Sequence, residues 1–296
     1  MKVFVTGGTG YVGSALVRAL VRARHQVTST SRSEASDRAL SALGATPVRG
    51  ALGGLAPLAG RIAEHDAAVH AAIDYGLGPP ADAEAIGALL DGARQAGRAF
   101  SVVYTSGVWV LGNTATPASE AEPIVRPAAA VAWRPPHERR VLEAATERIA
   151  TAVVRPGIVF GEKRGLVAPW FASAVKEGRA SFVGSGDQRW AFVHRSDLAE
   201  LYRLVLERTG RGIFHGVDGA APTVAEAAAA ASRAAGKGGA VRAIPVEDAR
   251  RTMGPMADAL AMDQVVVAAR GAELGWEPRH PPFLRDAPGA FREWVA

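Results

Sequence analysis

The residues best able to do chemistry stand at the start of the chain, in the sequence TGGTGYVG at 6–13. Glycines at this spacing, after a strand and at the start of a helix, form a turn that binds the pyrophosphate of a dinucleotide. Gly7 permits the tight turn, Gly10 lets the backbone approach the phosphates, and Gly13 lets helix and strand pack closely. The predicted cofactor contacts of this turn are Gly7, Thr9, Gly10, Tyr11, Val12 and Gly13.

The end of the second expected strand indicates which dinucleotide binds. An NAD enzyme typically has an acidic residue there, which binds the ribose hydroxyls. This chain has Ser31 and Arg32 instead, and an arginine among serines suits a 2′-phosphate through charge-assisted hydrogen bonds. We therefore expect NADP, as NADPH, in preference to NAD. The alternative is that Arg32 is an ordinary solvated loop arginine.

Further reactive side chains follow later strands. Asp74 and Tyr75 come just after the strand that ends at His70, and Ser106 follows the strand at 101–104. The carboxyl ends of parallel strands form the edge at which open α/β sheets bind ligands. Asp74 is therefore a candidate substrate contact, Ser106 a candidate catalytic hydroxyl and Tyr75 a candidate proton donor. Tyr75 could instead cap the cleft without taking part in chemistry.

The segment WRPPH at 133–137 holds three more candidates. Pro136 suits the first turn of a helix, which places His137 near a helix N-terminus, where the dipole disfavours the protonated imidazole. A neutral histidine can exchange a proton near pH 7. Trp133 could form an aromatic wall of the site, and Arg134 could bind the cofactor ribose or an anionic substrate. The alternatives are a solvated histidine, a core tryptophan and a surface ion pair.

These residues must be positioned by a regular α/β framework. Apolar strand-like runs alternate with helical stretches through the first half of the chain, which predicts a Rossmann-type, doubly wound parallel sheet with helices on both faces. After residue 157 the pattern becomes glycine-rich and irregular, which predicts a smaller C-terminal α/β substrate lobe. We expect residues 1–160 to form the dinucleotide-binding domain, with 187–217 returning to it, and 161–186 and 218–296 to form the lobe.

The chain resembles the extended and atypical short-chain dehydrogenase/reductases, which include nucleotide-sugar epimerases and dehydratases, over nearly its whole length. The resemblance rests on motifs that stand in the family's order. They are TGGTGYVG at 6–13, HAA at 70–72, YTSG at 104–107 leading to LG at 111–112, RPGIVFG at 155–161, WAFVHRSDLA at 190–199 and LGWEP at 274–278.

The resemblance implies further contacts. Alanines after the fourth strand would lie along the cofactor, the segment at 156–159 would line its nicotinamide end, and the loop before residue 190 would meet the substrate. Ala51-Leu52 stands where the family often has Asp-Leu, so adenine would be held by packing alone. The implied cofactor contacts are Leu52, Ala71, Ala72, Arg134, Pro156, Gly157 and Val159, and the implied substrate contacts are Arg189 and Trp190.

The chain departs from the family at the catalytic pair. The usual chemistry needs a tyrosine and, four residues later, a lysine that lowers the pKa of the phenol. One alignment puts Ala130 and Arg134 at these positions, and another puts Trp133 and His137 there. In both alignments the phenol is missing, so any reaction needs another source of protons.

Composition restricts the remaining possibilities. The chain has no cysteine, which fits a cytoplasmic location, and we expect no export signal, no membrane span and no metal site. Its net charge of +5 is spread over helices that also carry acids, so we expect no nucleic-acid partner. The exposed helices could pair two subunits, so a homodimer is possible.

We expect an NADPH-dependent reductase of a small organic carbonyl, imine or enone, with a non-standard catalytic site. The cofactor carries the hydride chemistry, so the protein need only orient the reactants and exclude water. The proton would come from His137, Tyr75, Ser106 or water. The alternatives are a non-redox isomerase, cyclase or lyase that keeps the dinucleotide as structural support, and an NADP-sensing regulator.

Overall fold

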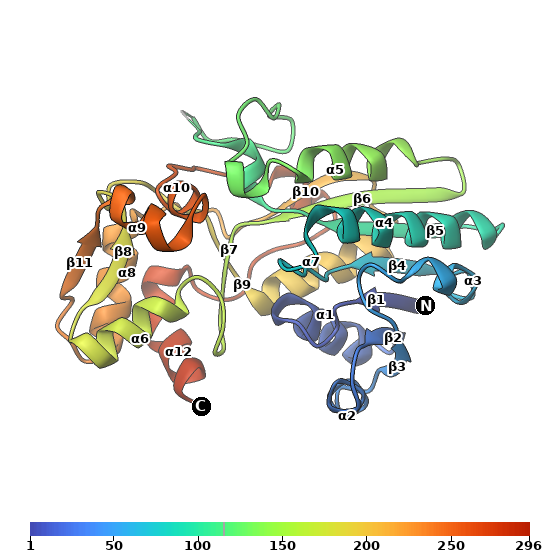
Figure 1. Ribbon diagram of the computed structural model, residues 1–296, viewed down its shortest axis with the longest axis horizontal. Coiled ribbons are helices and arrows are strands. Elements are labelled where there is room, and N and C mark those ends of the chain that lie inside the picture. The colour runs from blue at the N-terminus through green and yellow to red at the C-terminus, as the bar shows by residue number, and fades with distance from the viewer. Residues whose placement is uncertain (115) are drawn as a thin grey trace.

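Runs of small and branched apolar residues form the middle strands of the central sheet, because parallel strands covered on both faces read as continuous apolar segments. In the computed structural model, which describes residues 1–114 and 116–296, the sheet order is β10-β6-β5-β4-β1-β2-β3 and each pairing is parallel (Figure 1). The order runs outward in both directions from β1 and β4, which confirms the predicted doubly wound fold. The strands are β1 (Lys2–Thr6), β2 (Gln26–Ser31), β3 (Thr46–Arg49), β4 (Ala67–His70), β5 (Phe100–Thr105), β6 (Ile149–Pro156) and β10 (Gly212–Gly216).

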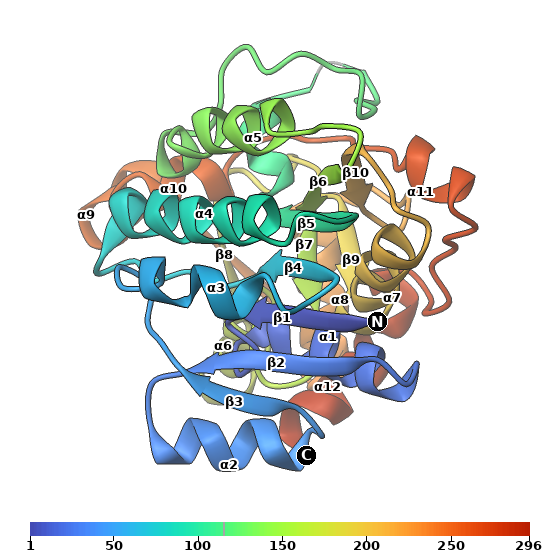
Figure 2. The same ribbon diagram turned by 90° about the vertical axis from the view of Figure 1, so that its right-hand side faces the viewer.

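Alternate residues of β1 point to two separate cores. Val3 and Val5 pack with α1 (Tyr11–Arg22) and α7 (Arg195–Glu207), whereas Phe4 packs with α4 (Gly78–Gln95) on the opposite face. Figure 2 shows α4 and α5 on one side of the sheet and α1 and α7 on the other. The other elements of this half are α2 (Glu34–Ala42), η1 (Ala56–Leu58), α3 (Ala59–Ile62), η2 (Val108–Leu111), η3 (Ala129–Val131), α5 (Arg134–Glu143) and α11 (Ala269–Glu273).

The C-terminal lobe has its own aromatic core. Trp170 stacks on Trp190 with ring centroids 5.3 Å apart, and Phe192 stacks on Phe283 at 5.1 Å. The alanine-rich helix α8 (Val224–Ala234) begins with a capping box between Thr223 and Glu226, which fixes its first turn. The elements of the lobe are β7 (Ile158–Phe160), α6 (Ala168–Glu177), β8 (Ala180–Val183), β9 (Phe192–His194), α8 (Val224–Ala234), β11 (Val241–Ile244), α9 (Val246–Met253), α10 (Met256–Leu260) and α12 (Phe283–Val295).

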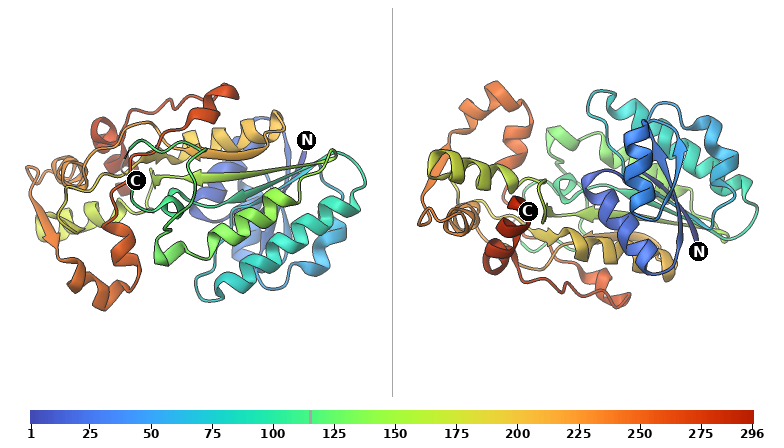
Figure 3. Two further views of the ribbon diagram at one scale, coloured as in Figure 1. Left: turned by 90° about the horizontal axis from the view of Figure 1, so that it is seen from above. Right: turned by 90° about the horizontal axis from the view of Figure 1, so that it is seen from below.

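The strands of the sheet end toward this lobe, while the N-terminus lies at the opposite end of the molecule (Figures 1 and 3). The segment expected to return to the first domain holds α7 and β10, and β10 pairs with β6. The segment 268–276 also packs against the core beneath α1 and α7, although it belongs to the range expected to form the lobe. Within the described residues, no helix combines the length and hydropathy that crossing a bilayer requires.

Candidate active site

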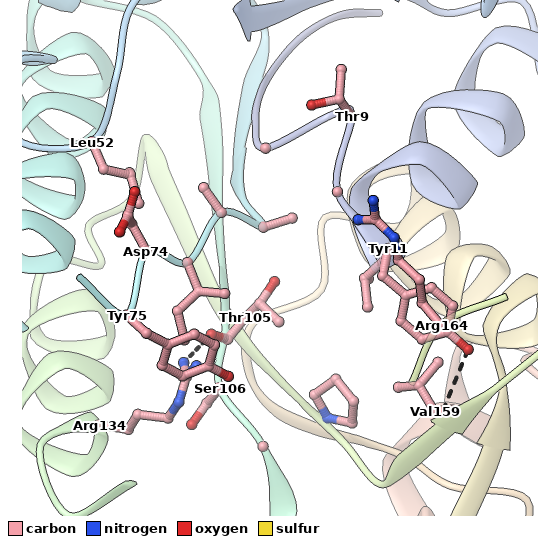
Figure 4. Close-up of a pocket in the computed structure, with 18 of the residues that line it drawn as sticks. Thr9, Tyr11, Leu52, Asp74, Tyr75, Thr105, Ser106, Arg134, Val159 and Arg164 are labelled. Atoms are coloured by element: carbon pink, nitrogen blue, oxygen red, sulfur yellow. Dashed lines mark hydrogen bonds between the residues drawn. The ribbon is translucent and has the colours of Figure 1, made fainter. Parts of the chain in front are cut away.

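A cavity of about 860 Å³ lies at the carboxyl ends of the strands. Its size falls within the range of about 300–1,000 Å³ that is usual for cofactor and ligand sites. It brings together the glycine-rich turn, the end of β2, the loops after β4 and β5, the start of α5 and the segment that follows β6 (Figure 4). Predicted residues that line it are Gly7, Thr9, Gly10, Tyr11, Val12, Arg32, Leu52, Ala71, Ala72, Asp74, Tyr75, Ser106, Trp133, Arg134, Pro156, Gly157 and Val159.

The glycine-rich turn has the geometry that a pyrophosphate needs. Gly7 has φ +78°, and a Cβ there would lie 2.6 Å from the Cα of Ala72. A Cβ on Gly13 would overlap the carbonyl oxygen of Gly7, so the helix approaches the turn as closely as predicted. No side chain caps the start of α1, which leaves its first backbone N–H groups for an anion. These residues fit a dinucleotide phosphate group.

The end of β2 brings one predicted residue to the cavity and excludes another. The side chain of Arg32 is 70% exposed and forms an ion pair with Asp74 at 3.0 Å, so it stands where an incoming phosphate could exchange with the carboxylate. Ser31 is buried, does not line the cavity and donates to the carbonyl of Ser33 (3.0 Å), which corrects its predicted role as a cofactor contact. Ser36, in the first turn of α2, lines the cavity instead.

Ser106 and Arg134 stand on the wall opposite the glycine-rich turn. The Oγ of Ser106 is buried at the cavity and has no hydrogen-bond partner among the described residues, which is unusual for a buried hydroxyl. Arg134 donates from Nη1 to the carbonyl of Thr105 (2.8 Å), and its guanidinium lies 4.4 Å from the ring centroid of Trp133. Tyr75 is 79% exposed at the rim. The wall therefore offers a hydrogen-bond donor beside a fixed positive charge.

Arg134 is held from behind by a buried polar network centred on Asp82 of α4. Its Nη1 also donates to the Tyr104 hydroxyl (3.2 Å), which in turn donates to Asp82 Oδ2 (3.1 Å). The same carboxylate accepts from His137 Nδ1 (2.7 Å) and from His70 Nε2 (3.1 Å). Because a carboxylate only accepts hydrogen bonds, both imidazoles are donors here.

Charge is unevenly distributed along this network. Burial opposes ionisation of Asp82, but the hydrogen bonds from His137 and His70 outweigh it and hold the pKa of the carboxyl well below its usual range. Burial raises the pKa of Tyr104, so its phenol stays protonated. The network therefore presents Arg134 to the cavity with an ionised carboxylate behind it.

His137 is not where the sequence analysis expected it. Its ring does not line the cavity, and it bonds Asp82 and packs edge-on against Trp133, with centroids 5.3 Å apart. Helix α5 begins at Arg134, so Pro136 lies in its first turn as predicted, but the helix turns Trp133 and Arg134 toward the cavity and His137 toward α4. This corrects its role from direct proton donor to support for the wall. Of the two alignments, the geometry favours the one with Ala130 and Arg134 at the catalytic positions.

Both substrate contacts expected from the later loop also need correction. Arg189 binds Asp263 through Nε (2.8 Å) and Nη2 (2.6 Å) and does not line the cavity. Trp190 is 4% exposed and stacks on Trp170 in the lobe core. The lobe reaches the cavity through other side chains, none of which a recognised motif identified. These are Arg164, Leu166 and Met256.

The residues 1–114 and 116–296 contain no group of three or more histidine, aspartate or glutamate side chains arranged to hold a metal ion.

Comparison with known proteins places this geometry in context. Residues 3–214 match the model of the NAD dependent epimerase/dehydratase family. An uncharacterized protein of Schizosaccharomyces pombe is 30% identical over 97% of this chain and 98% of its own length. A 2-alkyl-3-oxoalkanoate reductase of Stenotrophomonas maltophilia is 30% identical over 72% of this chain and 67% of its own.

Among solved structures, the human epimerase family protein SDR39U1 with NADPH superposes with a TM-score of 0.79. It is 23% identical, and the match covers 99% of each chain. A dTDP-glucose 4,6-dehydratase of Bacillus anthracis in complex with NAD gives 0.83 at 16% identity, over 100% of this chain and 96% of its own. These structures share the fold described above.

Proposed function

Because the chain belongs to the NAD dependent epimerase/dehydratase family, we propose that it is an NADPH-dependent reductase of a small organic carbonyl, imine or enone. One observation carries the proposal: a single cavity joins the glycine-rich turn to the unpartnered hydroxyl of Ser106 and the guanidinium of Arg134. Two relatives support it, the reductase of Stenotrophomonas maltophilia and a quinoline-1-oxide ketoreductase of Stigmatella aurantiaca that is 32% identical over 74% of this chain.

The preference for NADPH rests on Arg32. Its guanidinium lines the cavity at the end of β2, where an acidic residue would bind the ribose hydroxyls of NAD. Arg32 now forms an exposed ion pair with Asp74. Exchange of this pair for a bond to a dianionic phosphate favours the phosphorylated cofactor. We expect Arg32→Ala to weaken the binding of NADPH about tenfold and to leave the affinity for NADH nearly unchanged, as measured by calorimetric titration with both cofactors. Equal weakening of both cofactors would contradict the assignment.

NADPH would supply the hydride when bound, and the protein would supply the hydrogen bond, the positive charge and the proton that the reduction needs. Ser106 Oγ donates a hydrogen bond to the substrate oxygen or nitrogen that gains charge, and the fixed charge of Arg134 stabilises that charge. Tyr75 Oη, or a water molecule beside it at the rim, then delivers the proton that completes the alcohol, the amine or, for an enone, the saturated ketone. Trp133 and Trp109 line the same cavity with apolar surface, which excludes water from the reacting atoms.

The absence of the family's phenol favours a second candidate. Ala130 and Arg134 stand at the catalytic positions in the alignment that the geometry favours, so the family's usual proton-transfer group has no equivalent there. A non-redox isomerase, cyclase or lyase would keep the dinucleotide as support and use Ser106 and Arg134 to stabilise an anionic intermediate.

The test is the absorbance of protein-bound NADPH during addition of a panel of ketones, imines and enones. Oxidation with one class supports the reductase. We expect Ser106→Ala to lower kcat by about tenfold or more with little change in NADPH affinity, because the lost bond forms chiefly as charge develops. Ser119→Ala, outside the cavity, is the matched control. NADPH binding without oxidation by any class would reject the reductase in favour of the second candidate.

A further inference from the structure

The loop that follows β7, residues 161–166, lies against the glycine-rich turn. The hydroxyl of Tyr11 donates to the carbonyl of Gly161 at 2.7 Å, which joins the loop to the first residue of α1. Arg195 is buried beneath the turn and donates from Nη2 to the carbonyl of Tyr11 (2.6 Å) and to Ser14 Oγ (2.8 Å). The loop and the turn are thus fixed relative to each other by bonds from both sides.

Arg164 is the basic residue of this loop that lines the large cavity beside the phosphate-binding turn. Together with Thr9, Gly10 and Tyr11 it lines the large cavity (Figure 4). It also lines an adjoining cavity of about 350 Å³. Its side chain is exposed and forms no hydrogen bond or ion pair with any described residue. A guanidinium with no protein partner beside uncapped helix N–H groups is suited to an anion.

The neighbouring carboxylates are already engaged. Glu162 forms ion pairs with Arg18 (3.0 Å) and with Arg195, and Glu293 accepts from the backbone N–H of Glu162 at 2.9 Å. Three arginines line the large cavity, at positions 32, 134 and 164, and its lining contains one carboxylate, Asp74. The cavity therefore has an excess of positive charge, part of which lies over the turn.

We propose that Arg164 is a ligand of the pyrophosphate of the bound dinucleotide, holding it from the side opposite the N-terminus of α1. This rests on the proposed function only in that a dinucleotide occupies the cavity; it does not depend on hydride transfer. Because the pyrophosphate is common to NADPH and NADH, Arg164 contributes to the affinity for both. Arg32 differs, because it stands at the end of β2 and contacts only the 2′-phosphate on the ribose, which NADH lacks.

Calorimetric titration of the full chain with NADPH, NADH, ADP-ribose and adenosine 2′-monophosphate separates these roles. We expect Arg164→Ala to weaken the binding of NADPH, NADH and ADP-ribose about tenfold, as loss of a hydrogen bond to a charged group predicts. The affinity for adenosine 2′-monophosphate should stay unchanged, because this ligand has no pyrophosphate. Arg164→Lys should recover part of the loss, since lysine keeps the charge but not the planar fork.

Lys163→Ala is the matched control, because it removes the same charge from the same loop at a residue that lines the adjoining cavity but not the large one. Unchanged ADP-ribose affinity in Arg164→Ala, or an equal loss in Lys163→Ala, would overturn the proposal while leaving the dinucleotide site intact. If Arg164→Ala weakens ADP-ribose binding and the wild-type protein oxidises NADPH with none of the ketones, imines and enones tested, the proposal is supported and the reductase is rejected. Failure of the wild-type protein to bind any dinucleotide would reject both.

Discussion

The carboxylate of Asp82 holds together the wall that presents Arg134, and replacing it by asparagine tests that role. Asp82 is 4% exposed and accepts hydrogen bonds from His70, Tyr104 and His137. An asparagine keeps the shape and removes the charge. Its Oδ1 can still accept from Tyr104 and His137, and its amide can donate to His70 once that ring changes tautomer.

The magnitude follows from these three bonds. A hydrogen bond to a charged group contributes about 1.5–3 kcal/mol and one between neutral groups about 0.5–1.5 kcal/mol, so each bond loses about 1 kcal/mol. We expect Asp82→Asn to lower the free energy of unfolding by about 2–3 kcal/mol near pH 7. For a chain of this size that corresponds to a fall of roughly 3–5 °C in Tm.

The pH dependence gives the sharper test. Because the pKa of Asp82 is depressed in the folded state, its contribution is fully present above the unfolded pKa of about 3.9 and is lost as the pH falls toward the folded value. The difference in Tm between the wild type and Asp82→Asn should therefore be constant from pH 5 to 7 and should shrink below about pH 4.

Thermal unfolding at a series of pH values measures this difference. Asp91→Asn, an exposed position on the same helix whose carboxylate pairs with Arg94, is the matched control and should change Tm little at any pH. A Tm difference for Asp82→Asn that persists undiminished to the lowest pH would refute an ionised Asp82 in the folded protein. A difference near zero at pH 7 would refute the role of the network itself.

Two further substitutions test separate features. Gly13→Ala places a Cβ against the carbonyl oxygen of Gly7, so we expect a lower Tm and at least tenfold weaker NADPH binding by calorimetry; wild-type affinity would show that the turn can relax. Burial raises the pKa of Asp218 to about 6, so the wild type loses stability as the pH rises from about 4 to 6. Asp218→Asn lacks this titration, and its Tm relative to the wild type should rise over that window; a pH-independent difference would contradict the assignment.

The parts of the site that follow from local sequence were predictable. The glycine-rich turn is built from contiguous residues whose spacing sets its conformation, and Thr9, Tyr11 and Val12 line the cavity as that spacing implies. The alternation of apolar runs and helices was sufficient for the doubly wound sheet, because the central strands β1, β4, β5 and β6 are almost wholly buried and read as continuous apolar runs.

The parts that depend on distant partners were not predictable. Arg189 and Asp263 are 74 positions apart, and only the folded lobe brings them together and withdraws the arginine from the cavity. His137 was misplaced because a proline near a helix start does not fix the rotation of that helix, and a start at Arg134 turns the histidine toward Asp82. No local pattern marks a carboxylate such as Asp82 as the meeting point of several elements.

The position of β10 has a consequence for synthesis on the ribosome. All eight residues of β6 are buried, and β6 pairs with β5 on one side and with β10 on the other. The chain makes α6, β8, β9 and α7 before β10, so a nascent chain that has completed β6 still has one row of unpaired backbone groups along an apolar strand. Such an edge can pair with other chains. Slow translation between β6 and β10 should therefore favour aggregation or chaperone binding, whereas a pause after β10 should not.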